Sequence, residues 1–179
     1  MKIAVIGVGN ILFMDEGVGV YASRMLKENY VFEPGIEIID GGTLGFKLMD
    51  YFEEYDRVVI LDTVSIDDKP GTVYDLPAEA LMGLGDYRKT VHEVEVVGML
   101  EICSMLDKMA EVSVVGIIPE DIQTVEINLT KQVKQGLPLL LEKSVATLED
   151  AGISVRTKPQ QQTIEAILSF YKDPGMRLC

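Results

Sequence analysis

Apolar residues form two patterns along this chain: short continuous runs, and longer stretches with an apolar side chain every three or four positions. The continuous runs are rich in Ile and Val, which is typical of strands buried on both faces of a parallel sheet. The first such run occupies residues 2–8, and we expect further strands at residues 36–39, 57–61 and 111–118. The longer stretches have the spacing of amphipathic helices. They occupy residues 16–28, 45–54, 92–108 and 130–150.

Two further features refine this pattern. Residues 71–76 alternate between apolar and polar side chains after a Lys-Pro turn, and we expect an edge strand there. Gly136 and Pro138 should interrupt or kink the last long helix, because proline removes a backbone donor. Strands that alternate with helices predict an α/β fold, namely a single-domain, doubly wound, mostly parallel twisted sheet with helices on both faces.

The C-terminal residues differ from the rest of the chain in charge. We divide the sequence into an α/β domain at residues 1–155 and a C-terminal extension at 156–179, made of a linker and a short amphipathic segment over 164–171. The extension carries four Lys or Arg residues against two acids. We expect it to fold back on the acidic domain, to contact a neighbouring subunit, or to fray.

The overall charge excludes several kinds of partner. A net charge of −13 over 179 residues argues against nucleic acid and against an anionic membrane surface as partners.

We expect no signal peptide and no membrane insertion, because no apolar stretch is long enough to cross a bilayer. Only two cysteines are present, Cys103 and Cys179, which favours a reducing, cytoplasmic location over a disulfide framework.

Acidic residues follow the first and third predicted strands, at the edge where α/β proteins bind their ligands. Glu16 follows the first strand, Asp62 ends the third, and His92, the single histidine of the chain, opens a later helix. Two carboxylates and an imidazole suit Zn²⁺ or Ni²⁺ and leave one coordination position for water or substrate. Each residue also has a plain structural interpretation: a surface or capping histidine, a turn-capping Asp62, and a Glu16 that complements a helix dipole. The neighbouring Asp15 is a candidate N-cap for the first helix.

Six stretches, taken in order, resemble the [NiFe]-hydrogenase maturation endopeptidase family. They are Gly7-Val-Gly-Asn-Ile-Leu12, Asp15-Glu16-Gly17-Val-Gly19, Ile39-Asp-Gly-Gly-Thr-Leu-Gly45, Val59-Ile-Leu-Asp62, His92-Glu93 and Val115-Gly-Ile-Ile-Pro-Glu120. No single stretch is specific, but their combination over roughly residues 1 to 155 is.

The resemblance implies a protease that trims the C-terminal extension from the nickel-loaded [NiFe]-hydrogenase large-subunit precursor. The family's metal-binding residues fall on Glu16, Asp62 and His92, which are therefore the candidates for catalysis as well. The family's substrate-selecting loop falls on Asp40, Gly41, Gly42 and Thr43. The Ni²⁺ is supplied by the substrate, and Zn²⁺ or Cd²⁺ can occupy the same site in vitro. The ion then either polarises the scissile carbonyl or activates a water molecule, or it only docks the bond to be cut.

The main alternative is a phospho-acceptor signalling domain, which would use Asp15, Glu16 and Asp62. Such a domain needs a lysine after its last strand, where this chain has Pro119-Glu120. A small-molecule hydrolase or phosphorylase on a similar sheet is a third possibility, because fold does not fix function. Neither alternative accounts for His92 or for the loop that begins at Asp40.

Overall fold

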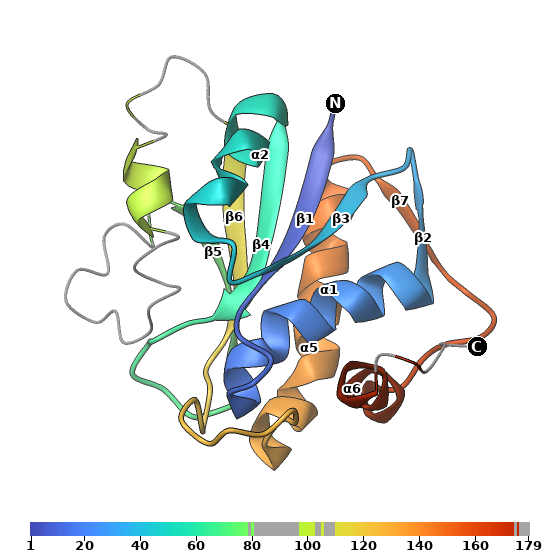
Figure 1. Ribbon diagram of the computed structural model, residues 1–179. Helices are drawn as coiled ribbons and strands as arrows, with labels where there is room; N and C mark the ends of the chain where they lie inside the picture. The colour runs from blue at the N-terminus through green and yellow to red at the C-terminus, as the bar shows by residue number, and fades with distance from the viewer. Residues whose placement is uncertain (79, 81–96, 103–104, 106–109, 174, 176–179) are drawn as a thin grey trace.

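In a computed structural model, which describes residues 1–78, 80, 97–102, 105, 110–173 and 175, a twisted sheet runs through the centre of the molecule (Figure 1). Within those residues it has five strands in the order β3-β1-β4-β6-β5. The strands are β1 (Ile3–Val8), β3 (Glu37–Gly42), β4 (Arg57–Thr63), β5 (Val73–Pro77) and β6 (Glu111–Ile117). Neighbouring strands are parallel except for β5, which pairs antiparallel with β6 at the edge. The sheet therefore confirms the predicted fold class and the predicted edge strand.

Each central strand supplies side chains to two hydrophobic cores, one on each face of the sheet. In β1, Val5 belongs to one core and Ile6 to the other, because successive side chains of a strand point to opposite faces. In β4, Val59 and Ile60 divide in the same way. This two-sided burial explains why these strands appear in the sequence as continuous apolar runs.

Helices cover both faces of the sheet (Figure 1). One core includes side chains from α1 (Val18–Asn29), α5 (Lys131–Asp150) and α6 (Ile164–Lys172). The other includes side chains from η2 (Gly45–Leu48), α2 (Met49–Glu54) and the helical residues 97–102. The remaining part of the helix predicted over 92–108, with His92 and Cys103, lies outside the described residues.

The predicted interruption of the last long helix is wrong. α5 continues through Pro138, and its apolar face is buried at Val133, Leu137 and Leu140. A Cβ atom added at Gly136 would lie 2.2 Å from the carbonyl oxygen of Gly71, so the loop before β5 packs closely on this part of the helix. Tertiary packing over both sides of the proline outweighs the lost backbone hydrogen bond.

The sequence patterns did not predict a second, two-stranded sheet. Strands β2 (Tyr30–Glu33) and β7 (Ser154–Thr157) pair antiparallel and fix the start of the C-terminal segment beside the end of α1. The Asn29 side chain then holds Gln162 through two hydrogen bonds, of 3.0 and 2.6 Å, just before α6 begins. In the part of the chain that the structure describes, no helix has the length and apolar character needed to span a bilayer.

Candidate functional site at the carboxyl ends of the strands

The turn after β1 is built by a glycine that no other residue can replace without strain. Gly9 has a φ of +138°, and its N–H group donates to the Gly42 carbonyl oxygen at 3.0 Å. A Cβ atom at this position would lie 1.9 Å from the Glu16 carbonyl oxygen. Gly9 therefore brings the backbone of Glu16 and the end of β3 against the same end of β1.

A second close approach brings the end of β4 to this point. A Cβ atom on Gly19, in the first turn of α1, would lie 2.0 Å from the Leu61 carbonyl oxygen and 2.3 Å from that of Val8. Glu16 lies in η1 (Met14–Gly17), directly before this turn, and Asp62 directly follows Leu61. The structure thus brings Glu16 and Asp62 to one edge of the sheet, as the sequence predicts.

The two acids differ in how firmly they are held. Asp62 is 3% exposed and lies within β4, where it is in register with Gly116 of β6. Its Oδ1 atom accepts a hydrogen bond of 2.7 Å from the Thr63 N–H group. Glu16 lies in the short η1 turn and is half-buried. The sheet fixes Asp62, whereas the turn after Gly9 places Glu16.

The third predicted ligand, His92, lies outside the described residues. Among the residues that are described, no three His, Cys, Asp or Glu side chains form a group that could hold a metal ion. Glu16 and Asp62 are therefore the two predicted ligands that lie within the described residues at this edge. Carboxylate oxygens can bind a divalent ion, and an imidazole nitrogen beside them would favour Zn²⁺ or Ni²⁺.

Asp15 has a different role from the one that its position in the sequence suggests. Its side chain is fully buried and accepts hydrogen bonds from the N–H groups of Glu120, Asp121 and Thr130 and from the Thr130 hydroxyl, at 2.7 to 3.0 Å. The predicted N-cap is wrong, because neither η1 nor α1 has a capping side-chain hydrogen bond. A carboxylate saturated by internal donors also removes the phospho-acceptor alternative that used Asp15. This residue holds the loop after β6 beside the site.

The segment Asp40–Thr43 ends β3 next to the turn at Gly9. Asp40 is in register with Gly7 and is exposed. Gly41 is buried, and a Cβ atom there would lie 2.7 Å from the Ile6 side chain. The Asp40 Oδ2 atom accepts a hydrogen bond of 3.2 Å from the Tyr171 hydroxyl, a contact with α6 that sequence spacing did not reveal.

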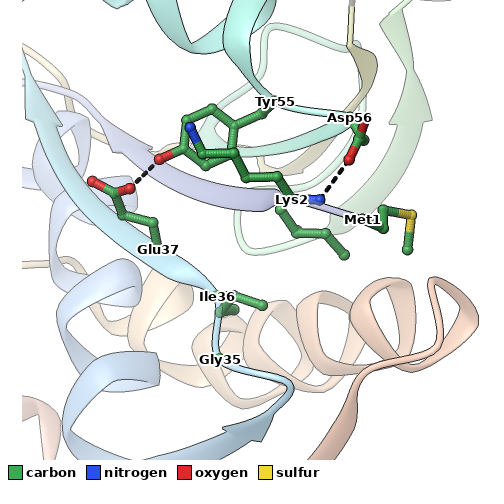
Figure 2. Close-up of a pocket in the computed structure, with 8 residues that line it drawn as sticks. Met1, Lys2, Gly35, Ile36, Glu37, Tyr55 and Asp56 are labelled. Carbon is green, nitrogen blue, oxygen red and sulfur yellow. Dashed lines mark hydrogen bonds between the residues drawn. The ribbon is translucent and has the colours of Figure 1, made fainter.

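Hollows occur at both edges of the sheet. Figure 2 shows one of about 650 Å³ at the amino-terminal ends of β1 and β3, lined by Lys2, Glu37, Tyr55 and Asp56 among others. At the opposite edge, a hollow of about 250 Å³ lies between the loops that follow β4 and β6, and Ser65 and Glu120 are among its lining residues. The smaller hollow adjoins the strand that carries Asp62.

Comparisons with known proteins agree with this arrangement. The family model for hydrogenase maturation protease matches residues 20–147. The hydrogenase 2 maturation protease of Escherichia coli (strain K12) is 34% identical over 158 residues, 86% of this chain and 94% of that protein. The hydrogenase expression/formation protein HupD of Rhizobium leguminosarum bv. viciae is 28% identical over 172 residues, 93% of this chain and 84% of that protein.

Solved structures show the same fold. The hydrogenase maturating endopeptidase HybD from E. coli superposes with a TM-score of 0.81 at 31% identity, over 88% of this chain and 98% of that one. The [NiFe] hydrogenase maturation protease HybD from Thermococcus kodakarensis superposes with a TM-score of 0.67 at 28% identity, over 82% and 99%. The resemblance is thereby confirmed: the chain belongs to the hydrogenase maturation protease family and is a peptide hydrolase.

Proposed function

We propose that this protein is the endopeptidase that removes the C-terminal extension of a nickel-loaded [NiFe]-hydrogenase large-subunit precursor, and that it recognises the nickel through Glu16, Asp62 and His92. The observation that carries the proposal is the meeting of Glu16 and Asp62 at one sheet edge in a member of this protease family. Family membership supports the peptidase activity, and the paired carboxylates support the metal-dependent choice of substrate.

The donor set suits an ion that arrives with the substrate. Two carboxylates and one imidazole are a sparse set of ligands for a resident metal, which usually has several further groups that orient its ligands. We expect protein purified without added metal to be close to metal-free, and added Zn²⁺, Cd²⁺ or Ni²⁺ to bind weakly. An empty precursor offers these residues nothing to bind, so discrimination follows metal occupancy.

The surface around the site suits a protein substrate. Exposed apolar side chains lie on the segments that follow the strands at this edge: Leu12 after β1, Leu44 and, in η2, Phe46 after β3, and Val125 after β6. The Met14 N–H group donates to the Glu126 carbonyl oxygen at 3.0 Å and so draws the loop of Val125 towards that of Leu12. Apolar groups gathered around a polar centre are typical of a surface that another protein covers. We place the reaction in the cytoplasm, which the low cysteine content favours.

The side chains of this chain hold and orient the substrate in the proposed reaction. Asp62 is fixed by β4 and by its hydrogen bond with Thr63, so it presents its carboxylate in one orientation. Glu16 lies in η1, whose backbone packs against the turn at Gly9. Together with His92 they would hold the substrate's nickel, which brings the scissile peptide bond to the sheet edge.

The proposal is tested with a nickel-loaded large-subunit precursor and purified protein, with release of the C-terminal peptide followed by mass spectrometry. We expect cleavage by the wild type and a loss of about 100-fold or more in Asp62→Asn. The matched control is Glu37→Gln, which changes a carboxylate at the opposite sheet edge and should process normally. No cleavage by the wild type, or wild-type rates in Asp62→Asn, would overturn the proposal.

A further inference from the structure

The last helix of the chain is seated firmly on the domain. α6 lies against α1, with Ile167 and Leu168 buried at 0% and 4% exposure (Figure 1). Its first turn is capped by the Thr163 hydroxyl, which accepts from the Ala166 N–H group at 3.2 Å. The family match ends at residue 147, so α6 lies beyond the part of the chain that the family model describes.

The end of α6 carries an aromatic group that is packed from two sides. The Tyr171 ring meets the Tyr21 ring of α1 and the Phe170 ring edge-to-face, each with centroids 5.4 Å apart. The Arg24 guanidinium lies over the Phe170 ring, 4.5 Å from its centroid. Edge-to-face and cation–π contacts favour a fixed ring orientation, so the Tyr171 hydroxyl is held in place.

This fixed hydroxyl reaches the carboxyl end of β3. It donates to the Asp40 Oδ2 atom at 3.2 Å, and Asp40 is 131 residues away in the sequence. Burial raises the pKa of Tyr171, and the nearby charge of Asp40 and the hydrogen bond to it raise that pKa further. The hydroxyl therefore stays protonated at neutral pH and remains a donor to the carboxylate.

A small hollow adjoins this contact. Its volume is about 50 Å³, and its lining residues are Ser23, Arg24, Lys27, Ile38, Asp40 and Tyr171. The space is too small for a ligand of its own but large enough for the tip of one side chain. Tyr171 binds Oδ2 of Asp40, and Asp40 is exposed, so its second carboxylate oxygen can accept a hydrogen bond from a donor on a partner.

We propose that Tyr171 is a positioning residue for substrate selection: it orients Asp40, and α6 is thereby part of the surface that distinguishes one precursor from another. The inference rests on the proposed function and on the expectation, implied by the family resemblance, that Asp40 contacts the precursor. Tyr171 itself acts through Asp40 and touches none of the reacting atoms.

A double-mutant cycle tests this assignment with the nickel-loaded precursor. Tyr171→Phe keeps the ring and removes the hydroxyl, and we expect it to raise both KM and the Kd of the precursor about three- to tenfold with kcat unchanged. Asp40→Asn should have a similar effect, and the double variant should be no worse than Asp40→Asn alone. Tyr55→Phe, which removes a hydroxyl from a carboxylate pair at the other end of β3, is the matched control and should match the wild type.

The outcomes separate this inference from the proposed function. A precursor that the wild type binds but does not cleave overturns the protease assignment, while the Kd values still test Tyr171. Equal Kd values for wild type and Tyr171→Phe, or additive losses in the double variant, overturn the role of Tyr171. A fall in the thermal midpoint of Tyr171→Phe with unchanged KM and Kd would show a structural contact only and would also overturn it.

Discussion

The two ends of β3 each carry a carboxylate that accepts a hydrogen bond from a tyrosine, yet the two pairs are built differently. At the amino-terminal end, Tyr55 donates to Glu37 from only 18 residues away (Figure 2). At the carboxyl end, Tyr171 donates to Asp40 across 131 residues. The first pair is made between neighbouring elements, whereas the second draws the last helix of the chain to the candidate site.

The surroundings of the two pairs sharpen this contrast. At the amino-terminal edge, the Lys2 N–H group donates to the Asp56 carboxylate at 2.5 Å, and the Lys2 ammonium lies 4.1 Å from the centroid of the Tyr55 ring. The Asp56 and Glu37 carboxylates there accept hydrogen bonds from residues of the same edge. At the carboxyl edge, acids are placed by close backbone approaches at glycines. The hollow of about 650 Å³ lies at the amino-terminal edge, and neither Glu16 nor Asp62 is among its lining residues.

The largest effect on stability should come from the glycine that joins α1 to the strand ends. Gly19→Ala would place a Cβ atom 2.0 and 2.3 Å from two carbonyl oxygens, so the helix must move and separate Glu16 from Asp62. We expect a loss of about 3 kcal/mol in the free energy of unfolding, measured by denaturant titration, together with loss of processing. Gly35→Ala, at the opposite edge and with no atom within 4 Å, is the matched control and should be close to neutral. Equal stability of the two variants would contradict the inference that close backbone packing matters more at the carboxyl ends of the strands than at their amino-terminal ends.

A smaller loss is expected from the buried acid beside the site. Asp15→Asn replaces one carboxylate oxygen by an amide nitrogen, so at least one of the four donors loses its acceptor. The free energy of unfolding should fall by about 2 kcal/mol. Asp56→Asn makes the same exchange at the exposed amino-terminal edge and should lower it by less than about 1 kcal/mol. A larger loss in Asp56→Asn than in Asp15→Asn would contradict the account.

The smallest effect concerns Tyr55, and its signature is a change in the pH dependence of stability in alkali. The hydrogen bond to Glu37, with burial and nearby acids, raises the pKa of Tyr55 from 10.0 to about 12. The folded state therefore holds this proton more tightly than the unfolded state, and the resulting stability is complete below pH 10 and is lost as the pH rises to about 12. In Tyr55→Phe, the free energy of unfolding should fall less steeply over that range in a pH series of denaturant titrations. An unchanged slope would show that the Glu37 pair makes no such contribution.

Sequence patterns predicted most of the fold because its central strands are buried on both faces. The Ile and Val residues of β1 and β4 supply both cores, so these strands appear as continuous apolar runs in the local sequence. The pattern at Pro138 was misleading, because packing against the loop at Gly71 keeps α5 continuous. The strands β2 and β7 are short and lie 121 or more residues apart where they pair, so their partnership has no local signal.

The candidate site was predictable to the extent that its residues follow strands. Glu16 and Asp62 come to one edge because parallel strands end together, and their place is fixed by that topology. The roles of Asp15 and Tyr171 depend on partners more than 100 residues away, which sequence spacing does not reveal. The structural role of His92 remains a prediction, since it lies outside the described residues.

The nickel dependence of precursor cleavage is the most direct test of whether this protein recognises the substrate's nickel. The same large-subunit precursor is prepared with and without nickel, mixed with the protein, and weighed by mass spectrometry before and after. We expect the C-terminal peptide to be released from the nickel-loaded precursor, and the nickel-free precursor to keep its full mass under the same conditions. Equal cleavage of the two forms would contradict recognition of the substrate's nickel by Glu16, Asp62 and His92.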